Sequence, residues 1–267
     1  MTNGATEAIY LIAQAFCGSH SAVWIPTFSE YADACRLHGH RVEGISSLEK
    51  LTGNEGIFWL CNPNNPTGQT WDAATLRRLI ATYPRKLFVI DQSYALFTEK
   101  KVLSVAETVK LPNVLLLHSM TKCYAVPGLR LGAVTGSREL LSRIRACRMP
   151  WSVNALAVEA GHYLLQHPGE YRMDIQALLT ERRRVTDALE ALGGVEVLPT
   201  DTHYFLARLQ QGTAAQLKEF LATRHGLLIR DASNFEGLDA RYFRIAIQTE
   251  EENNLLIEGI HEWIQNS

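Results

Sequence analysis

Short apolar runs alternate with polar, helix-prone stretches over the first 150 residues of the chain. The apolar runs are rich in β-branched and aromatic side chains, which is typical of buried strands. They predict strands at 22–25, 56–61, 86–90, 114–117 and 131–134, with helices at 6–16, 31–38 and 72–83. Because strands and helices alternate, we expect a mainly parallel sheet with helices on both faces. Ligands of such sheets bind at the carboxyl ends of the strands.

The pattern changes after about Pro150, where two long helical stretches begin. The second half predicts helices at 152–166 and 169–192, a strand-like hairpin at 195–209, a helix at 214–225, strands at 227–234 and 242–247, and a last helix at 250–263. This order indicates a smaller α+β domain. The predicted organisation is therefore an α/β large domain at 1–152 and an α+β small domain at 153–267.

The composition is that of an ordinary globular protein. The 267 residues carry a formal charge of −2, and 46% of them are hydrophobic. This leaves enough apolar material for a core and argues against disorder. A near-neutral charge argues against nucleic-acid binding. No apolar run reaches the ~18 residues that a membrane helix needs, and the N-terminus lacks the pattern of a secretory signal.

Cysteine and histidine usage adds two expectations. The five cysteines contain no C-x-x-C pair, which is usual in a reducing compartment, so we expect a cytoplasmic protein. The nine histidines show no H-E-x-x-H and no paired spacing with cysteine, so no metal site is expected.

Two polar segments directly follow predicted strands. The first, N-P-N-N-P-T-G at 62–68, contains two prolines and a glycine and therefore indicates a rigid turn, although a surface loop is an alternative. The second begins at Asp91, which ends the strand at 86–90. A carboxylate in that place needs a cationic or hydrogen-bonding partner, and the alternative is a helix N-cap.

A third segment follows the strand at 114–117 and carries Ser119, Thr121, Lys122 and Arg130. A partly desolvated lysine near another cation has a lowered pKa and can act as a nucleophile. The two hydroxyls and the guanidinium suit a phosphate. The alternative for Lys122 is an ordinary solvated lysine.

The residues Gly4, Ala5 and Thr6 open the first predicted helix. Backbone N–H groups at a helix N-terminus bind phosphate well. A capping box is the alternative, because Asn3 is a good cap residue and Glu7 follows in the first turn.

The order of these motifs is more specific than any one of them. N-P-x-N-P-T-G at 62–68, D-x-S-Y at 91–94, S-x-x-K at 119–122 and G-L-R-x-G at 128–132 together resemble the fold-type I pyridoxal-phosphate (PLP) enzymes of the class I/II aminotransferase family. Within that family the chain looks most like histidinol-phosphate aminotransferases and threonine-phosphate decarboxylases. The resemblance runs from Asn3 to the C-terminus.

The resemblance implies a role for each residue at the cofactor. Lys122 would form the Schiff base with the cofactor aldehyde and then move protons at the substrate Cα. Asp91 would pair with the pyridine nitrogen, and Tyr94 and Asn65 would hydrogen-bond the 3-oxygen of the ring. Phe28 would stack on the ring face, with core packing as the alternative. The phosphate would be held by Gly4, Ala5, Thr6, Ser119, Thr121 and Arg130.

Two arginines in the second half complete the implied site. Arg230 and Arg244 each belong to a strand-like run, and arginine forks bind carboxylate or phosphate in a bidentate way. The resemblance implies that they grip the acidic end of the substrate. A surface ion pair is the alternative for Arg230.

The start of the chain departs from the family pattern, because only Met1 and Thr2 precede the Asn3-Gly4 motif. The family's N-terminal arm and first strand would then be missing, which would leave an edge of the sheet unpaired. The family's two-subunit active site implies a homodimer.

The leading hypothesis is a PLP-dependent aminotransferase that acts on a small phosphorylated amino acid or amine, with an amino donor and a 2-oxo acid as its small-molecule partners. A PLP-dependent threonine-phosphate decarboxylase is the runner-up, and a truncated remnant of low activity is a third possibility. Ser119 and Lys122 also fit the S-x-x-K element of serine acyl-transfer enzymes, but the accompanying S-D-N and K-T-G elements are absent.

Overall fold

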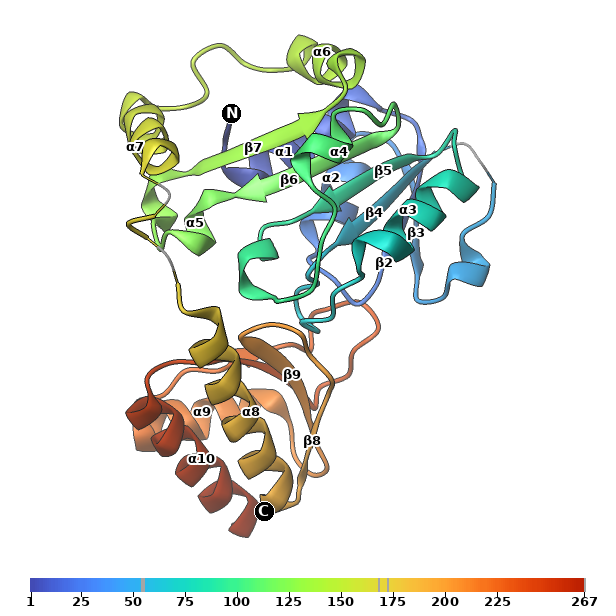
Figure 1. The fold of residues 1–267 in the computed structure, drawn as a ribbon. Helices are drawn as coiled ribbons and strands as arrows, with labels where there is room; N and C mark the ends of the chain where they lie inside the picture. Colours follow the sequence, from blue (N-terminus) through green and yellow to red (C-terminus); the bar gives the residue numbers. More distant parts are fainter. Residues whose placement is uncertain (54–55, 168, 172, 267) are drawn as a thin grey trace.

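The computed structural model describes residues 1–53, 56–167, 169–171 and 173–266. The chain forms two sheets, each covered by helices, as Figure 1 shows. The larger sheet has seven strands in the order β1-β7-β6-β5-β4-β2-β3. These strands are β1 (Thr2–Asn3), β2 (His20–Trp24), β3 (Arg41–Ile45), β4 (Ile57–Cys61), β5 (Leu87–Asp91), β6 (Val114–Ser119) and β7 (Leu131–Gly136).

Five neighbouring strands of the seven run parallel to one another, namely β3, β2, β4, β5 and β6. Strands β7 and β1 are antiparallel to their neighbours. The predicted mainly parallel sheet is therefore confirmed. The strand at 41–45 was not predicted, because its sequence R-V-E-G-I mixes charged and apolar residues at the sheet edge. The short strand β1 pairs with Leu131 and Gly132 and covers that part of the opposite edge.

Helices pack on both faces of the large sheet. On one face lie α1 (Gly4–Ala15), α2 (Glu30–Leu37) and α6 (Arg138–Ala146), and on the other lie α3 (Ala73–Thr82) and α4 (Val105–Thr108). Alternate residues of β4 show this layering: Trp59 packs in the core under α1 and α2, whereas Phe58 and Leu60 pack in the core under α3. The β-strand period of two thus gives central strands such as β4 and β5 two buried faces.

The smaller sheet has the order β10-β11-β9-β8 and is antiparallel throughout. Its strands are β8 (Val195–Val197), β9 (Tyr204–Leu209), β10 (Arg230–Asp231) and β11 (Tyr242–Ala246), and its helices are α8 (Ile175–Leu192), α9 (Ala214–His225) and α10 (Glu250–Gln265). The helices share one core with Phe205, Ala207, Phe243 and Ile245. The side chains between these positions, including Leu206, belong to the other face of the sheet.

The predicted helix at 169–192 begins too early. Helix α8 starts at Ile175, since the carboxylate of Asp174 accepts a hydrogen bond from the N–H of Ala177 at 2.9 Å and caps the helix there. The preceding helix α7 (Ala155–Gln166) packs on the large sheet, with Gly161 facing Leu131. The domain boundary between 152 and 153 stays a prediction.

The remaining short elements are α5 (Met120–Cys123) and the 3₁₀ turns η1 (Leu48–Lys50), η2 (Ala95–Phe97) and η3 (Pro127–Leu129). Among the described helices, none is long and apolar enough to cross a bilayer. The cytoplasmic location stays a prediction.

One close approach fixes the N-terminus of α1 against the sheet. A Cβ atom on Gly132 would lie 2.6 Å from the carbonyl carbon of Gly4 and 2.7 Å from the nitrogen of Ala5. Both are backbone atoms of a helix end and cannot move aside cheaply. Gly132 is therefore required for β7 to pass this close to α1.

We predict that Gly132→Ala lowers the free energy of unfolding by about 1 to 3 kcal/mol, because the added methyl group overlaps backbone atoms. Gly128→Ala in the same motif is the matched control. No heavy atom lies within 4 Å of a Cβ built at Gly128, so its effect should stay within about 0.5 kcal/mol. Urea unfolding of both variants measures the difference, and equal losses would contradict the prediction.

Candidate active site

The N-terminus of α1 forms one end of a pocket at the carboxyl ends of the central strands. Asn3 precedes the helix and makes no side-chain capping hydrogen bond, although its own N–H donates to the carboxylate of Glu7. Only half of the capping box is therefore present. Ala5 and Thr6, in the first turn, line the pocket. A helix end of this kind favours an anion.

Arg130 lies over the same helix end. It is in the left-handed conformation with a φ of 55°, and its Nη1 donates a hydrogen bond to the carbonyl of Pro127 at 3.0 Å. A Cβ atom on Gly4 would lie 2.8 Å from Nη2 of Arg130. A residue larger than glycine at position 4 would therefore crowd the guanidinium group. Gly4 does not itself line the pocket but allows Arg130 to reach it.

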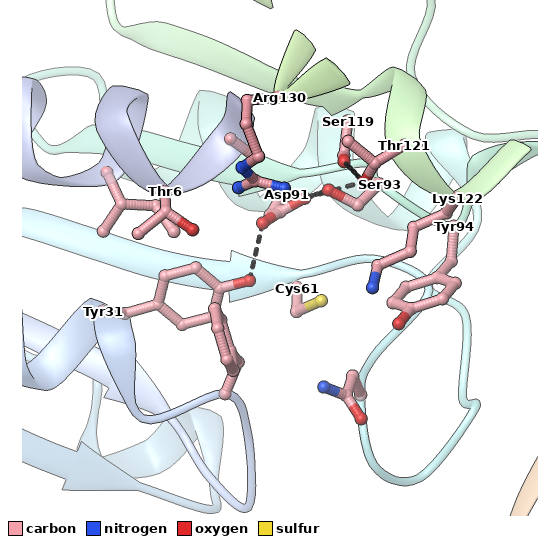
Figure 2. Close-up of a pocket in the computed structure, with 14 residues that line it drawn as sticks. Thr6, Tyr31, Cys61, Asp91, Ser93, Tyr94, Ser119, Thr121, Lys122 and Arg130 are labelled. Atoms are coloured by element: carbon pink, nitrogen blue, oxygen red, sulfur yellow. Dashed lines mark hydrogen bonds between the residues drawn. The ribbon is translucent and has the colours of Figure 1, made fainter. Parts of the chain in front are cut away.

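Two buried hydroxyls complete this end of the pocket. Ser119 ends β6 and Thr121 lies in the short helix α5, and their side-chain oxygens are 2.7 Å apart. Both line the pocket together with Arg130 (Figure 2). Hydroxyls, a guanidinium and a helix N-terminus together are suited to a phosphate group.

Asp91, the last residue of β5, is 4% exposed and accepts three hydrogen bonds. The N–H and hydroxyl of Ser93 donate to its Oδ1 at 2.8 and 2.6 Å, and the hydroxyl of Tyr31 donates to its Oδ2 at 2.8 Å. The helix N-cap alternative for Asp91 is wrong, because the bond to Ser93 closes a local turn and no helix begins there. These donors compensate a buried carboxylate and leave it in the pocket wall.

Tyr31 and Cys61 were missed by the sequence analysis. Tyr31 is 2% exposed, and its ring stacks on Trp59 with centroids 5.8 Å apart. Burial and the charge of Asp91 raise the pKa of Tyr31 well above its ordinary value, so its hydroxyl remains a donor. The pKa of Cys61 is raised to about 12, chiefly by burial. The place of Cys61 at the carboxyl end of a predicted strand could have indicated it, whereas nothing in the local pattern of Tyr31 indicated a contact with the pocket.

Lys122 projects into the pocket from α5, beside Tyr94 and on the other side from Tyr31 (Figure 2). Partial desolvation lowers the pKa of its amine, and the positive charges of Arg244 and Arg130 lower it further, whereas the charge of Asp91 opposes this. The side chain is exposed, but the positive charges of two arginines act on its amine. Such a lysine has a larger fraction of neutral, nucleophilic amine than a solvated one.

Asn65 and Tyr94 line the pocket near Lys122. The loop that carries Asn65 is buried, with Asn62 and Asn64 at 0% and 4% exposure, so the surface-loop alternative is wrong. Burial raises the pKa of Tyr94, and the charge of Arg244 partly opposes the rise.

Phe28 also lines the pocket, and it packs against the hydrophobic core and edge-on against Tyr31. Stacking and core packing are therefore not exclusive for this residue. The complete pocket has a volume of about 140 Å³ and is lined by Ala5, Thr6, Ile9, Phe28, Tyr31, Cys61, Asn65, Asp91, Ser93, Tyr94, Ser119, Thr121, Lys122 and Arg130.

The two predicted substrate arginines differ in position. They are directly opposite each other in the register of β10 and β11. Arg244 is partly buried and its Nη1 donates a hydrogen bond to Oδ1 of Asn65, so it reaches the edge of the pocket. Arg230 is exposed, and it donates to Oδ1 of Asn234 at 2.9 Å instead of forming a surface ion pair. Neither arginine lines the pocket itself.

Metal binding has no visible site in the described part of the chain, where no group of three or more His, Cys, Asp or Glu side chains is placed to hold an ion.

Comparison with known proteins gives a family for this site. The family described as aminotransferase class I and II matches residues 1–260. The crystal structure of L-threonine-O-3-phosphate decarboxylase from Porphyromonas gingivalis is 40% identical with a TM-score of 0.96, over 99% of this chain and 82% of that one.

Two curated relatives are similar over 97% of this chain. The threonine-phosphate decarboxylase of Salmonella typhimurium is 32% identical over 74% of its own length, and a histidinol-phosphate aminotransferase of Desulfitobacterium hafniense is 30% identical over 76% of its length. The chain thus spans about three quarters of these relatives.

The chain belongs to the class I and II aminotransferase family of fold-type I PLP enzymes. The predicted family and the predicted cofactor are both confirmed. The acyl-transfer interpretation of S-x-x-K is set aside, because the chain belongs to the aminotransferase family and not to the serine acyl-transfer enzymes. The hydroxyl of Ser119 is also hydrogen-bonded to that of Thr121.

We predict that Arg130→Met raises the pKa of the Lys122 amine, because one of the positive charges that lower it is removed. At a fixed pH below that pKa, less neutral amine is then present and Lys122 reacts more slowly. Reductive methylation of cofactor-free protein over a pH series, with mass spectrometry of the peptide that contains Lys122, measures the midpoint. Arg143→Met, which removes an arginine that stacks on Phe16, is the control. Identical midpoints for both variants would contradict the prediction.

We predict that Tyr31→Phe lowers the free energy of unfolding by about 1.5 to 3 kcal/mol, because a buried carboxylate loses a donor while the ring remains. Tyr10→Phe is the control. It removes a similar hydrogen bond, from Tyr10 to Glu30 at 2.9 Å, between partly exposed side chains, and should cost no more than about 1 kcal/mol. Urea unfolding at pH 7 compares the two, and a smaller loss for Tyr31→Phe would refute this account of Asp91.

Proposed function

We propose that the chain is a PLP-dependent enzyme that acts on a small phosphorylated amino acid or amine. The observation that carries this proposal is the gathering of Lys122, Asp91 and Arg130 with the N-terminus of α1 around one pocket. The residue types fit the cofactor: one amine, one buried carboxylate and one anion site.

The residues would hold the cofactor as follows. The first turn of α1, Ser119, Thr121 and Arg130 would bind its phosphate. Asp91 would accept a hydrogen bond from the ring nitrogen, Phe28 would cover a ring face, and Asn65 and Tyr94 would bond the 3-oxygen. When bound, PLP condenses with amino groups and acts as an electron sink for the substrate Cα.

The chain's own residues then supply the proton transfers. Lys122 would attach the cofactor and, once displaced by substrate, would carry a proton to or from Cα. Its lowered pKa favours the neutral base that such a transfer needs. The negative charge of Asp91, held by Tyr31 and Ser93, favours a proton on the ring nitrogen.

Decarboxylation of a phosphorylated amino acid is the reaction we favour. Its support is the 40% identity to the Porphyromonas gingivalis decarboxylase, which exceeds the identity to the histidinol-phosphate aminotransferases. Arg244, joined to Asn65, would hold the substrate carboxylate. Decarboxylation requires the bond from Cα to the carboxylate to lie perpendicular to the ring, whereas transamination requires the Cα–H bond there. The position of Arg244 would influence this choice.

Transamination of a phosphorylated amine is the second candidate. The observation in its favour is the 30% identity to the Desulfitobacterium hafniense aminotransferase over nearly the whole chain. In that reaction Lys122 would remove the proton from the substrate Cα and deliver it to the cofactor.

A homodimer is part of the proposal. Large apolar side chains are exposed on and just before α7, where a second copy could cover them, and they are Met149, Trp151, Leu156, Tyr163 and Leu165. Exposed apolar patches of this kind mark interaction surfaces.

We predict that borohydride reduction of the PLP-loaded chain leaves a covalent cofactor adduct on Lys122. Product analysis with O-phospho-L-threonine, and with histidinol phosphate plus 2-oxoglutarate, then assigns the reaction. Lys122→Ala should lose the adduct and lower turnover by about 10²- to 10⁴-fold or more. Lys110→Ala, at an exposed position outside the pocket, should change neither.

The outcomes separate the candidates. Loss of CO₂ from phosphothreonine supports decarboxylation, and formation of glutamate from 2-oxoglutarate supports transamination. Adduct formation without turnover of either substrate would match the low-activity alternative. An adduct that survives in Lys122→Ala would contradict the proposal as a whole.

A further inference from the structure

The small sheet contacts the large domain next to the pocket, at the loop of residues 62–70. Residues 200–204, which lead into β9 and include its first residue, lie against the loop that carries Asn65. The N–H of Asp201 donates to the carbonyl of Gly68 at 3.0 Å, and the N–H of Thr70 donates to Oδ2 of Asp201 at 2.8 Å. Lys100 pairs with the same carboxylate oxygen at 2.8 Å.

The contact is close enough to require a glycine. Gly68 has a φ of +71°, and a Cβ atom there would lie 1.9 Å from Oγ1 of Thr200 and 2.8 Å from the carbonyl oxygen of Tyr204. The glycine of the N-P-x-N-P-T-G motif thus allows the second sheet to dock on the loop. The motif therefore serves the contact between the sheets as well as the turn itself.

Tyr204 is the residue that links this contact to the pocket. It is 1% exposed, and its hydroxyl donates to the carbonyl of Asn64 at 3.0 Å. Its ring packs edge-on against Tyr94 with centroids 4.9 Å apart. The guanidinium carbon of Arg244 lies 5.3 Å from the centroid of the same ring, within the range of a cation–π contact.

Three contacts therefore meet at one side chain. The hydroxyl of Tyr204 fixes the backbone immediately before Asn65, and its ring supports Arg244 from the neighbouring strand of the small sheet. Arg244 in turn donates to Asn65. The relative position of Asn65 and Arg244 consequently depends on a phenol that belongs to neither.

We propose that Tyr204 is a positioning residue that ties the loop carrying Asn65 to the strand carrying Arg244, and so fixes the site for a substrate carboxylate between the two sheets. This inference rests on the proposed function, in which Arg244 binds that carboxylate. The hydroxyl is the part that matters, since a phenyl ring alone would still support Arg244 but would leave the loop backbone unattached.

The experiment measures carboxylate recognition separately from cofactor binding and turnover. The probes are 3-(phosphonooxy)butanoate and propan-2-yl phosphate, which share a phosphate and differ by the carboxylate group. Neither carries an amine, so neither reacts with the cofactor. Calorimetric titration of the PLP-loaded chain with each probe gives two Kd values. The Kd of propan-2-yl phosphate divided by the Kd of 3-(phosphonooxy)butanoate reports the contribution of the carboxylate to binding.

We predict that Tyr204→Phe reduces this ratio by about three- to tenfold, the loss expected for one hydrogen bond. The Kd of propan-2-yl phosphate should stay unchanged. Asp201→Ala, which loosens the same segment without touching Arg244 or Asn65, should reduce the ratio in the same direction. Arg244→Lys should remove most of the preference for the probe that carries the carboxylate.

Tyr83→Phe is the matched control, because the hydroxyl of Tyr83 also donates to a backbone carbonyl, that of Leu51 at 2.7 Å, away from the pocket. It should leave the ratio unchanged. A Tyr204→Phe ratio equal to that of Tyr83→Phe, in a protein where Arg244→Lys does reduce it, would overturn the positioning role alone. A wild-type chain without any preference for the carboxylate probe would overturn the carboxylate site of the proposed function and this inference with it.

Discussion

A buried negative charge at the end of β5 is the constraint on which the site depends. Asp91 is almost without contact to water, so its two oxygens require donors from the protein. Ser93 supplies two of them from the next turn, and Tyr31 supplies the third from helix α2. One face of the carboxylate remains directed at the pocket, where a cationic ring nitrogen would complete its hydrogen bonding. The side chains around it are therefore arranged to hydrogen-bond a buried charge.

The opposite charge is distributed over the rest of the pocket. Burial lowers the pKa of the Lys122 amine, and two arginines, Arg244 in β11 and Arg130 just before β7, lower it further. The proposed phosphate end is built from close approaches at Gly4 and Gly132, which place a helix end and Arg130 together. The proposed substrate end is built from the contact between the two sheets at Gly68 and Tyr204. Glycines thus permit close contacts at both ends of the pocket: Gly4 and Gly132 at the end of α1, and Gly68 where the small sheet meets the loop.

Much of the fold was predictable, because buried parallel strands are continuous apolar runs with polar motifs at their carboxyl ends. The strands that end at Asp91 and Ser119 show this pattern plainly. The strand at 41–45 did not, since an edge strand is only half buried and its composition is mixed. The start of α8 was placed too early, because Glu170, Tyr171 and Met173 are residue types that a helix also accepts. Tyr31 could not be found from its neighbours, because its partner is 60 residues away.

The sequence by itself determined the family, the cofactor and the motif residues, because these depend on residue types at fixed local spacing beside strand ends. Only the tertiary structure decided which side chains meet. Arg230 and Arg244 look equivalent in the sequence, yet Arg244 reaches Asn65 and Arg230 turns to Asn234. That difference depends on how the small sheet docks on the loop at 62–70. Docking is set by contacts between residues more than a hundred positions apart, such as Tyr204 with Asn64, and no local pattern encodes them.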